Sequence, residues 1–306
     1  MIRSAILPVL AALTLPLNGA VVVAAGYNRP APVDIAPGQI LTFYVQGMGA
    51  NLTAPVYAAS LPLPLSLGGI SAQFVQGVFI APVPLLSVRP VSPCAYHTDP
   101  GCGSSYLAIR VQIPFGFDYS DPTVIRGVPV IEGQIRFSEN GAVVASVDAT
   151  PLSDQVHVLR NCDDFLFNQT SCAPIVTHAD GSQVDLGHLA KSGEEIVIYA
   201  VGLGVSQSTI QAGQAVIAPI PTSVSVSFDW LPNALGSRAI PARLAQPAFA
   251  GLVTGYVGLY QINVVVPPVP PGTPACTGNP VGMSSNLTIN IVGHSSFDGA
   301  RICASP

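Results

Sequence analysis

Residues 37–49 read PGQILTFYVQGMG, and residues 192–204 read SGEEIVIYAVGLG. The two stretches align without gaps and share a turn glycine, a run of β-forming residues that includes a tyrosine, and a terminal Gly-x-Gly. Such a run between turn residues is typical of a strand. Because this signal recurs much later in the chain, it indicates that one structural unit is present twice.

Two further pairs of segments repeat in the same order along the chain. LPLP at 61–64 resembles APIP at 218–221, and IRVQIP at 109–114 matches INVVVP at 262–267. In the second pair, alternate positions are apolar and a proline ends each run. Period-two alternation that stops at a proline is typical of a half-buried strand. The sequence therefore predicts duplication of one β unit.

Composition and turn chemistry indicate the fold class. The 306 residues include 29 Gly and 30 Pro, which disfavour long helices. Each unit closes with a hairpin-like segment that contains Asn140-Gly141 or Asp298-Gly299, and both pairs tolerate positive φ. Many short strands joined by turns favour β-sandwiches. We expect an all-β protein with module 1 at 21–150, a disulfide-tied connector at 151–187 and module 2 at 188–306.

The first 20 residues have the layout of a secretory signal peptide. Met1-Ile2-Arg3 is a positive start, residues 5–17 are apolar, and small residues follow up to Ala20 or Ala25, the two competing cleavage points. The apolar stretch is too short to cross a membrane, and no later segment approaches about 18 uninterrupted apolar residues. The sequence therefore predicts a secreted or cell-surface protein whose mature chain has no transmembrane segment.

The six cysteines fall into three local pairs. An exported chain meets an oxidising environment, in which cysteines form disulfides. Zinc binding requires closer ligand pairs such as C-x-x-C, and the sequence has none. Spacing alone does not fix the connectivity. We predict the local pairing: Cys94 with Cys102, Cys162 with Cys172, and Cys276 with Cys303.

Several motifs together resemble a known family. The most specific are IVIYAVGLG at 196–204 and GYVGLYQINV at 255–264, accompanied by AAGYN at 24–28, IAPGQIL at 35–41 and DGS at 180–182. This combination is similar to the Solibacter-type C-terminal domain family of secreted acidobacterial proteins, over nearly the whole mature chain. The resemblance implies tandem immunoglobulin-like modules with no established activity.

No catalytic constellation is apparent in the sequence. The five histidines are scattered, and none lies in H-E-x-x-H or beside a G-x-S-x-G serine. The Gly-x-Gly sequences at 47–49 and 202–204 lack the third glycine and the helix of a dinucleotide loop, so strand-end turns explain them better. We predict that the chain is not an enzyme, has no catalytic residue and binds no cofactor.

Loop carboxylates are the only candidates for a metal site. Asp163 with Asp164, and Asp180 with Asp185, could supply oxygen ligands to calcium. The Asp-x-Asp-x-Asp-Gly spacing of a calcium loop is missing, which favours solvated loop acids. We therefore predict no metal site, with Asp163 and Asp164 as the calcium candidates to examine.

Three aromatic residues are candidate ligand-binding residues: Trp230, Tyr256 and Tyr260. Exposed on one sheet face, they would stack on sugar rings, whereas Phe228 and Trp230, two positions apart, are typical of packed strand residues. The alternative is therefore that these three aromatic residues pack in the core.

Function is predicted only in outline. The formal net charge is −5 and 9% of the residues are charged, which disfavours a nucleic-acid partner. We predict a non-catalytic secreted or cell-surface β-sandwich protein with an adhesion, assembly or envelope-structural role and an extracellular protein or glycan as partner. The alternative is a carbohydrate-binding module that uses exposed aromatics.

Overall fold

In the described residues, all regular secondary structure consists of strands. The computed structural model describes residues 19–26, 32–91, 106–119, 132–163, 173–204, 211–215, 223–230, 243–271, 276, 286–291, 294–295 and 299–305. These segments contain strands β1 to β22 and no helix. None of them accordingly supplies a helix long and apolar enough to cross a membrane. Residues 1–18 of the predicted signal peptide lie outside the described residues.

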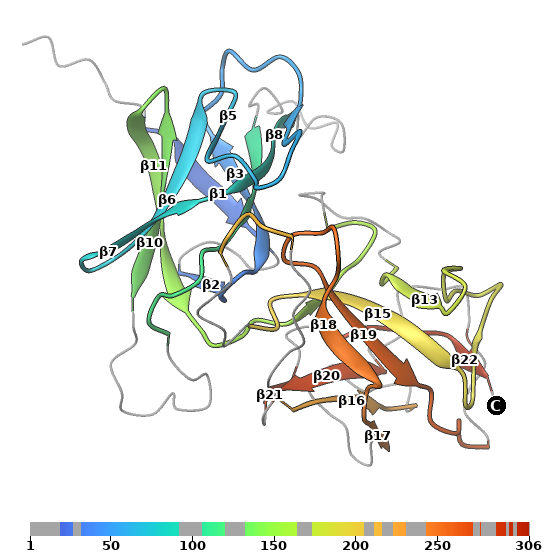
Figure 1. The fold of residues 1–306 in the computed structure, drawn as a ribbon. Coiled ribbons are helices and arrows are strands. Elements are labelled where there is room, and N and C mark those ends of the chain that lie inside the picture. The colour runs from blue at the N-terminus through green and yellow to red at the C-terminus, as the bar shows by residue number, and fades with distance from the viewer. Residues whose placement is uncertain are drawn as a thin grey trace, which may run out of the picture.

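The first sandwich consists of two sheets (Figure 1). One has the strand order β1-β3-β9-β8-β4, and the other has the order β2-β11-β10-β6-β5, with β7 also paired to β6. The strands are β1 (Val21–Ala25), β2 (Val33–Ile35), β3 (Ile40–Gln46), β4 (Val56–Tyr57), β5 (Ser66–Leu67), β6 (Ile70–Gln76), β7 (Phe79–Val83), β8 (Leu85–Val91), β9 (Tyr106–Gln112), β10 (Gly133–Glu139) and β11 (Ala142–Pro151).

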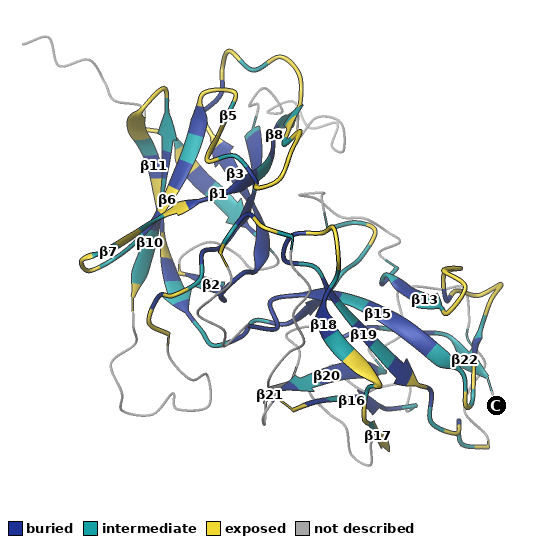
Figure 2. Cartoon of the chain, viewed as in Figure 1, coloured by how far each residue is buried: buried dark blue, intermediate teal, exposed yellow. Residues whose placement is uncertain are grey.

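Apolar side chains from both sheets fill the interior of the first sandwich. Phe43 of β3 lies against Phe137 of β10 with ring centroids 5.2 Å apart, and Phe74 of β6 lies 5.0 Å from Phe117. Phe43, Phe74 and Phe137 are fully buried. Along β11, buried and exposed positions alternate for much of the strand (Figure 2), because successive side chains of a strand point to opposite faces.

The second sandwich has a similar construction. One sheet has the order β12-β15-β19-β18 with β13 also paired to β15, the other has the order β17-β16-β20-β21, and β14 pairs with β22. The strands are β12 (His157–Val158), β13 (Val176–His178), β14 (Ala190–Lys191), β15 (Glu195–Val201), β16 (Val224–Phe228), β17 (Arg243–Ala245), β18 (Phe249–Leu252), β19 (Tyr260–Val265), β20 (Leu287–Ile291), β21 (His294–Ser295) and β22 (Ala304–Ser305).

The strands of the repeated sequence occupy equivalent places in the two sandwiches. β3 and β15, which carry the aligned stretches, are interior strands, and each pairs antiparallel with the strand of the second match, β9 or β19. A short parallel pair also recurs, β2 with β11 and β14 with β22. The prediction of an all-β chain with two tandem immunoglobulin-like sandwiches is confirmed.

The predicted connector is attached to the second sandwich. Residues 151–187 supply β12 and β13, and both strands pair antiparallel with β15. Cys162 in this segment is disulfide-bonded. Its predicted partner Cys172 lies outside the described residues, as do Cys94 and Cys102.

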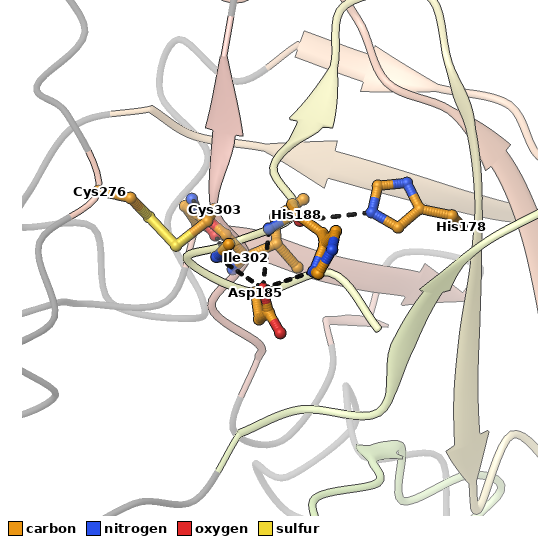
Figure 3. Close-up of a disulfide and its surroundings, with 8 residues drawn as sticks. His178, Asp185, His188, Cys276, Ile302 and Cys303 are labelled. Carbon is orange, nitrogen blue, oxygen red and sulfur yellow. Dashed lines mark hydrogen bonds and ion pairs between the residues drawn. A yellow bond between two sulfur atoms is a disulfide. The ribbon is translucent and has the colours of Figure 1, made fainter. Parts of the chain in front are cut away.

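The predicted disulfide between Cys276 and Cys303 is confirmed. The two Cα atoms are 5.5 Å apart, and the bond joins the segment before β20 to the chain just before β22 (Figure 3). No described cysteine is free. This bond ties the chain just before β22 to residue 276, which lies between β19 and β20 in the sequence.

The turn before β3 brings the two modules into contact. Gly38 has φ of +71°, a left-handed conformation that glycine adopts without strain. A Cβ at this position would lie 2.4 Å from Cζ of Phe115, and Phe115 packs against the core of the second sandwich. The repeat-equivalent Gly193 has φ of +82°, but no atom would lie within 4 Å of its Cβ. The two glycines therefore share a backbone conformation and differ in packing.

We expect Gly38→Ala to lower the free energy of unfolding by about 1–3 kcal/mol more than Gly193→Ala. Both substitutions carry the cost of a positive φ, and Gly38→Ala adds overpacking against Phe115. Chemical denaturation of the two variants measures the difference. Equal destabilisation would contradict the packing of the first module's turn against the second module.

Candidate functional site

An apolar cluster, which we call the junction, joins the two sandwiches. Ile40 and Leu63 of the first module pack with Val201 and Val257 of the second, and all four side chains are buried. Around them lie partly buried apolar residues from both modules: Ala58, Leu86, Leu159 and Ala215. Because both modules contribute to one buried cluster, they are docked against each other and not only linked by the chain.

The amide of Gln112 lies buried in the junction. Gln112 is the last residue of β9 and is 1% exposed. Its Oε1 accepts a hydrogen bond of 2.5 Å from the backbone N–H of Gly213, and its Nε2 donates one of 3.4 Å to the carbonyl of Gly38. The carbonyl of Gly213 in turn accepts a 2.8 Å bond from the N–H of Leu63. Hydrogen bonding offsets the cost of burying this amide.

Gln39 forms a second polar contact between the modules. Its side chain is 0% exposed. Oε1 accepts a 2.9 Å bond from the N–H of Ala36 within the same turn, and Nε2 donates a 3.4 Å bond to the carbonyl of Gln155 in the second module. Both ends of the amide are used, one within its own turn and one across the junction.

The residue equivalent to Gln39 in the second module is Glu194. Its Oε2 accepts a 2.8 Å bond from the N–H of Lys191, three residues earlier, as Gln39 does from Ala36. The same turn thus recurs with an amide at the junction and a carboxylate near the other end of the second sandwich. A charged group is tolerated at the second position because Glu194 is partly exposed and its other carboxylate oxygen contacts the His178 ring.

Gln39→Glu is expected to lower the free energy of unfolding by about 3 kcal/mol or more at pH 7, because it puts an unpaired carboxylate opposite the Gln155 carbonyl in a buried site. Lowering the pH should restore part of the loss, since protonation regenerates a hydrogen-bond donor. Glu194→Gln is the matched control and should cost much less at pH 7. Urea denaturation at two pH values measures both, and a tolerated Gln39→Glu would contradict the buried junction.

β13 and β22 lie at the same end of the second sandwich (Figure 1), and His178 of β13 and Ser305 of β22 line a pocket of about 600 Å³. Its lining includes His178, His188, Asp180, Lys191 and Glu194. The pocket thus gathers titratable side chains of both signs, in a chain in which charged residues are scarce.

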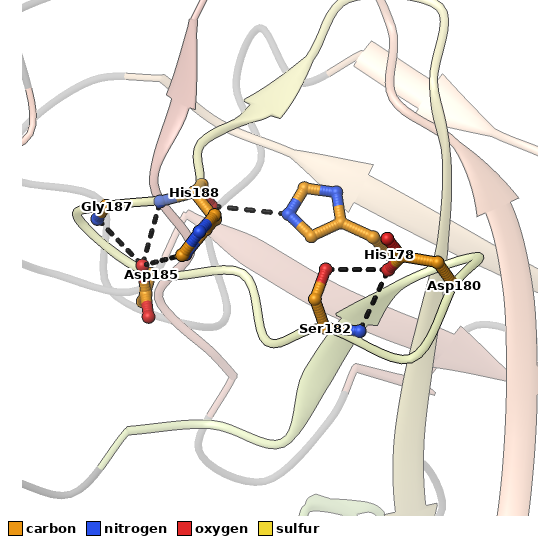
Figure 4. A network of polar contacts seen from close by, with 6 residues as sticks. All are labelled: His178, Asp180, Ser182, Asp185, Gly187 and His188. Carbon is orange, nitrogen blue, oxygen red and sulfur yellow. Dashed lines mark hydrogen bonds and ion pairs between the residues drawn. The ribbon is translucent and has the colours of Figure 1, made fainter.

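Two aspartates in this region stabilise local turns (Figure 4). Oδ1 of Asp180 accepts hydrogen bonds from the hydroxyl and the N–H of Ser182, at 2.6 and 2.9 Å, and these bonds lower the pKa of Asp180. Oδ1 of Asp185 accepts bonds from the N–H groups of His188 and Gly187, at 2.8 and 2.7 Å, which lower its pKa as well. Both carboxylates are therefore occupied within their own turns.

His178 lies between two turns at the edge of the pocket. Its Nδ1 is 2.5 Å from Oε1 of Glu194, and its Nε2 is 3.3 Å from the carbonyl oxygen of His188. The hydrogen bond with Glu194 is the main cause that raises the pKa of His178, and burial acts in the opposite direction. Burial acts to raise the pKa of Glu194, but the bonds from His178 and Lys191 lower it overall.

The disulfide-bonded C-terminal segment forms the other side of this region. The N–H of Ala190 in β14 donates a 2.9 Å bond to the carbonyl of Cys303, and β14 continues in parallel pairing with β22. Figure 3 shows Cys303 close to the turn that carries Asp185 and His188. Ser305 of β22 lines the pocket.

The calcium candidates do not meet at a common site in the described residues. Oδ2 of Asp163 lies 3.0 Å from Nε2 of His157 and accepts a 2.7 Å bond from the N–H of Arg160, so it fixes its own turn. Asp164 lies outside the described residues. Within the described ranges, no three His, Cys, Asp or Glu residues are grouped to hold a metal ion.

The three aromatic candidates have different environments. Tyr260 is 0% exposed and belongs to the core of the second sandwich, where burial raises its pKa. Trp230 is half-buried and stacks on Phe228 with centroids 5.6 Å apart. Tyr256 is 61% exposed, next to Val257 of the junction. Of the three, Tyr256 alone is well placed to contact a ligand.

Comparisons with known proteins give no assignment. No family model and no curated protein matches the chain. Among solved structures, the adhesin InvE of Yersinia pseudotuberculosis is similar at 13% identity and a TM-score of 0.18, with 90% of this chain and 56% of that chain covered. The C-terminal domain of the AgI/II polypeptide BspA of Streptococcus agalactiae is similar at 9% identity and a TM-score of 0.21, with 90% and 96% covered.

The chain thus spans little more than half the length of the InvE chain that it matches. TM-scores this low carry no argument about fold or function. The fold assignment rests on the strand pairing within the two sandwiches.

Proposed function

We propose that the chain is a non-catalytic secreted or cell-surface protein whose two docked sandwiches form a stiff module for adhesion, assembly or envelope architecture. The observation that supports this role most directly is the junction. Ile40, Leu63, Val201 and Val257 share one buried cluster, and Gln39 and Gln112 add hydrogen bonds across it. A tandem with such a contact resists bending between its modules, and a stiff frame serves to present or space a binding surface.

Extracellular placement is part of the proposal. The Cys276–Cys303 disulfide is of the kind that forms in oxidising compartments. We propose signal cleavage after Ala20 and not after Ala25, because β1 pairs with β3 and places Val22 and Ala25 in the first core. Cleavage after Ala25 would remove that strand.

Membership of the Solibacter-type C-terminal domain family remains a proposal based on the sequence motifs. The two most specific motifs coincide with central elements of the second sandwich. The first, 196–204, covers β15 and the turn after it, and the second, 255–264, covers most of β19 and the turn before it. The family's lack of an established activity accords with a structural role.

The proposal has two partner classes, an extracellular protein and a glycan. The carbohydrate-binding alternative now depends mainly on Tyr256, since Tyr260 is buried and Trp230 packs on Phe228. A glycan array probed with the wild-type chain and with Tyr256→Ala addresses it. Saturable binding that Tyr256→Ala abolishes would favour the alternative over a purely structural role.

The stiff-module proposal is tested by opening the junction. Leu63 is buried in the junction, whereas Leu65, two residues later, is 49% exposed. We expect Leu63→Asp to broaden the distribution of distances between labels on the two modules in single-molecule energy transfer, and Leu65→Asp to leave the distribution narrow. An aspartate at the buried position places a charge in an apolar contact.

The same variants connect stiffness to function. Beads coated with the wild-type chain or with Leu65→Asp should be retained equally under flow on a surface that carries the partner, and Leu63→Asp beads should be retained less. Equal retention of all three would remove the role assigned to the junction. Saturable turnover in a panel of hydrolase substrates would contradict the non-catalytic assignment.

A further inference from the structure

Both ring nitrogens of His178 face an oxygen atom. Nδ1 faces a carboxylate oxygen of Glu194, and Nε2 faces the carbonyl oxygen of His188. A carbonyl oxygen and an ionised carboxylate are acceptors only, and a neutral imidazole carries one N–H. With a neutral ring, one of the two contacts would therefore place a lone pair against an acceptor oxygen. The imidazolium satisfies both.

The two partners of His178 belong to different turns. Glu194 ends the turn before β15 and is fixed there by the N–H of Lys191. His188 ends the turn 185–188, in which the N–H of Asp185 donates a 3.0 Å bond to the same His188 carbonyl, and Gly187 and His188 form part of the pocket wall. His178 itself lies at the end of β13, with a side chain that is 13% exposed. Figure 4 shows the contact between the His178 ring and His188. Together with the contact to Glu194, the ring therefore bridges a turn of the sheet and a turn of the pocket wall.

We propose that His178 is a proton-operated clamp: the imidazolium ties the pocket-wall turn 185–188 to Glu194, and loss of its proton releases the turn. The opposite side of the pocket is fixed, because β14 and β22 are paired and Cys303 is disulfide-bonded. Release therefore changes the shape of the pocket through the 185–188 turn and leaves the sandwich intact.

The charges around the ring favour the clamped state. Glu194 and Asp180 both raise the pKa of His178. Lys191 lines the same pocket, and its positive charge acts on Glu194, while the His188 ring is 69% exposed and bonds to Asp185.

The sign of the pH dependence follows from this raised pKa. Because the folded state binds the proton more tightly than the ordinary pKa of about 6.5 implies, the stabilisation is complete below that pH. It is lost as the pH rises through the raised pKa of His178. Acidification therefore closes the clamp, and alkaline conditions open it.

The clamp is tested on the intact protein by NMR. We expect the His178 ring to titrate with a pKa above the ordinary histidine value of about 6.5. The backbone amide signals of Gly187 and His188 should shift through the same titration as the ring loses its contact with the His188 carbonyl, while both amides stay bonded to Asp185. Both changes should follow the same titration curve.

Three variants separate the clamp from a general effect of pH. His178→Gln should abolish the shift of these amide signals, because no titrating ring remains against the turn. His188→Gln should keep the transition, because the backbone carbonyl that accepts the bond remains. Glu194→Gln should move the transition to lower pH, because it removes the negative charge that holds the proton.

The wild-type titration decides the proposal even where a variant does not fold. A His178 pKa at or below the ordinary histidine value of about 6.5, or amide signals of residues 187–188 that do not shift through the titration, would overturn it. Loss of the transition in His188→Gln would assign the effect to the other histidine and would also overturn it.

Discussion

The structure depends on the burial of two amides where the sandwiches meet. Gln39 and Gln112 are removed from solvent together with the apolar cluster of Ile40, Leu63, Val201 and Val257. Burial of an amide is costly unless its hydrogen bonds are made. Here the partners include backbone groups of the opposite module, so the bonds exist only while the modules are docked. The junction couples the position of one sandwich to that of the other.

The same turn serves two purposes in the two sandwiches. In both copies, the third residue of the aligned stretch accepts a bond from the N–H three residues earlier. At the junction this residue is the neutral Gln39, because a carboxylate there would be buried opposite a carbonyl. Near the pocket it is Glu194, which is partly exposed and has His178 as partner. The environment of each copy thus accounts for the chemistry of its side chain.

Much of the fold could be predicted from the sequence, because period-two runs, turn glycines and their repetition are local signals. The aligned stretches correspond to β3 and β15, and Cys276 pairs with Cys303. The junction could not be predicted, because Gln112 occupies a polar position of an alternating strand, and periodicity does not show what covers that face. For Tyr260 too, periodicity does not show whether the side chain packs in the core or contacts a ligand. The clamp could not be predicted from the sequence, because turns, and not a spaced motif, bring His178, His188 and Glu194 together.

The most direct test of the docked junction is a set of backbone residual dipolar couplings measured on the whole chain. If the amides of β3, β9 and β10 and those of β15, β19 and β20 report one common alignment tensor, the two sandwiches move as one body, as the buried glutamines and the shared apolar cluster require. Two tensors that differ in magnitude would show that the sandwiches reorient independently, and this result would contradict a docked junction.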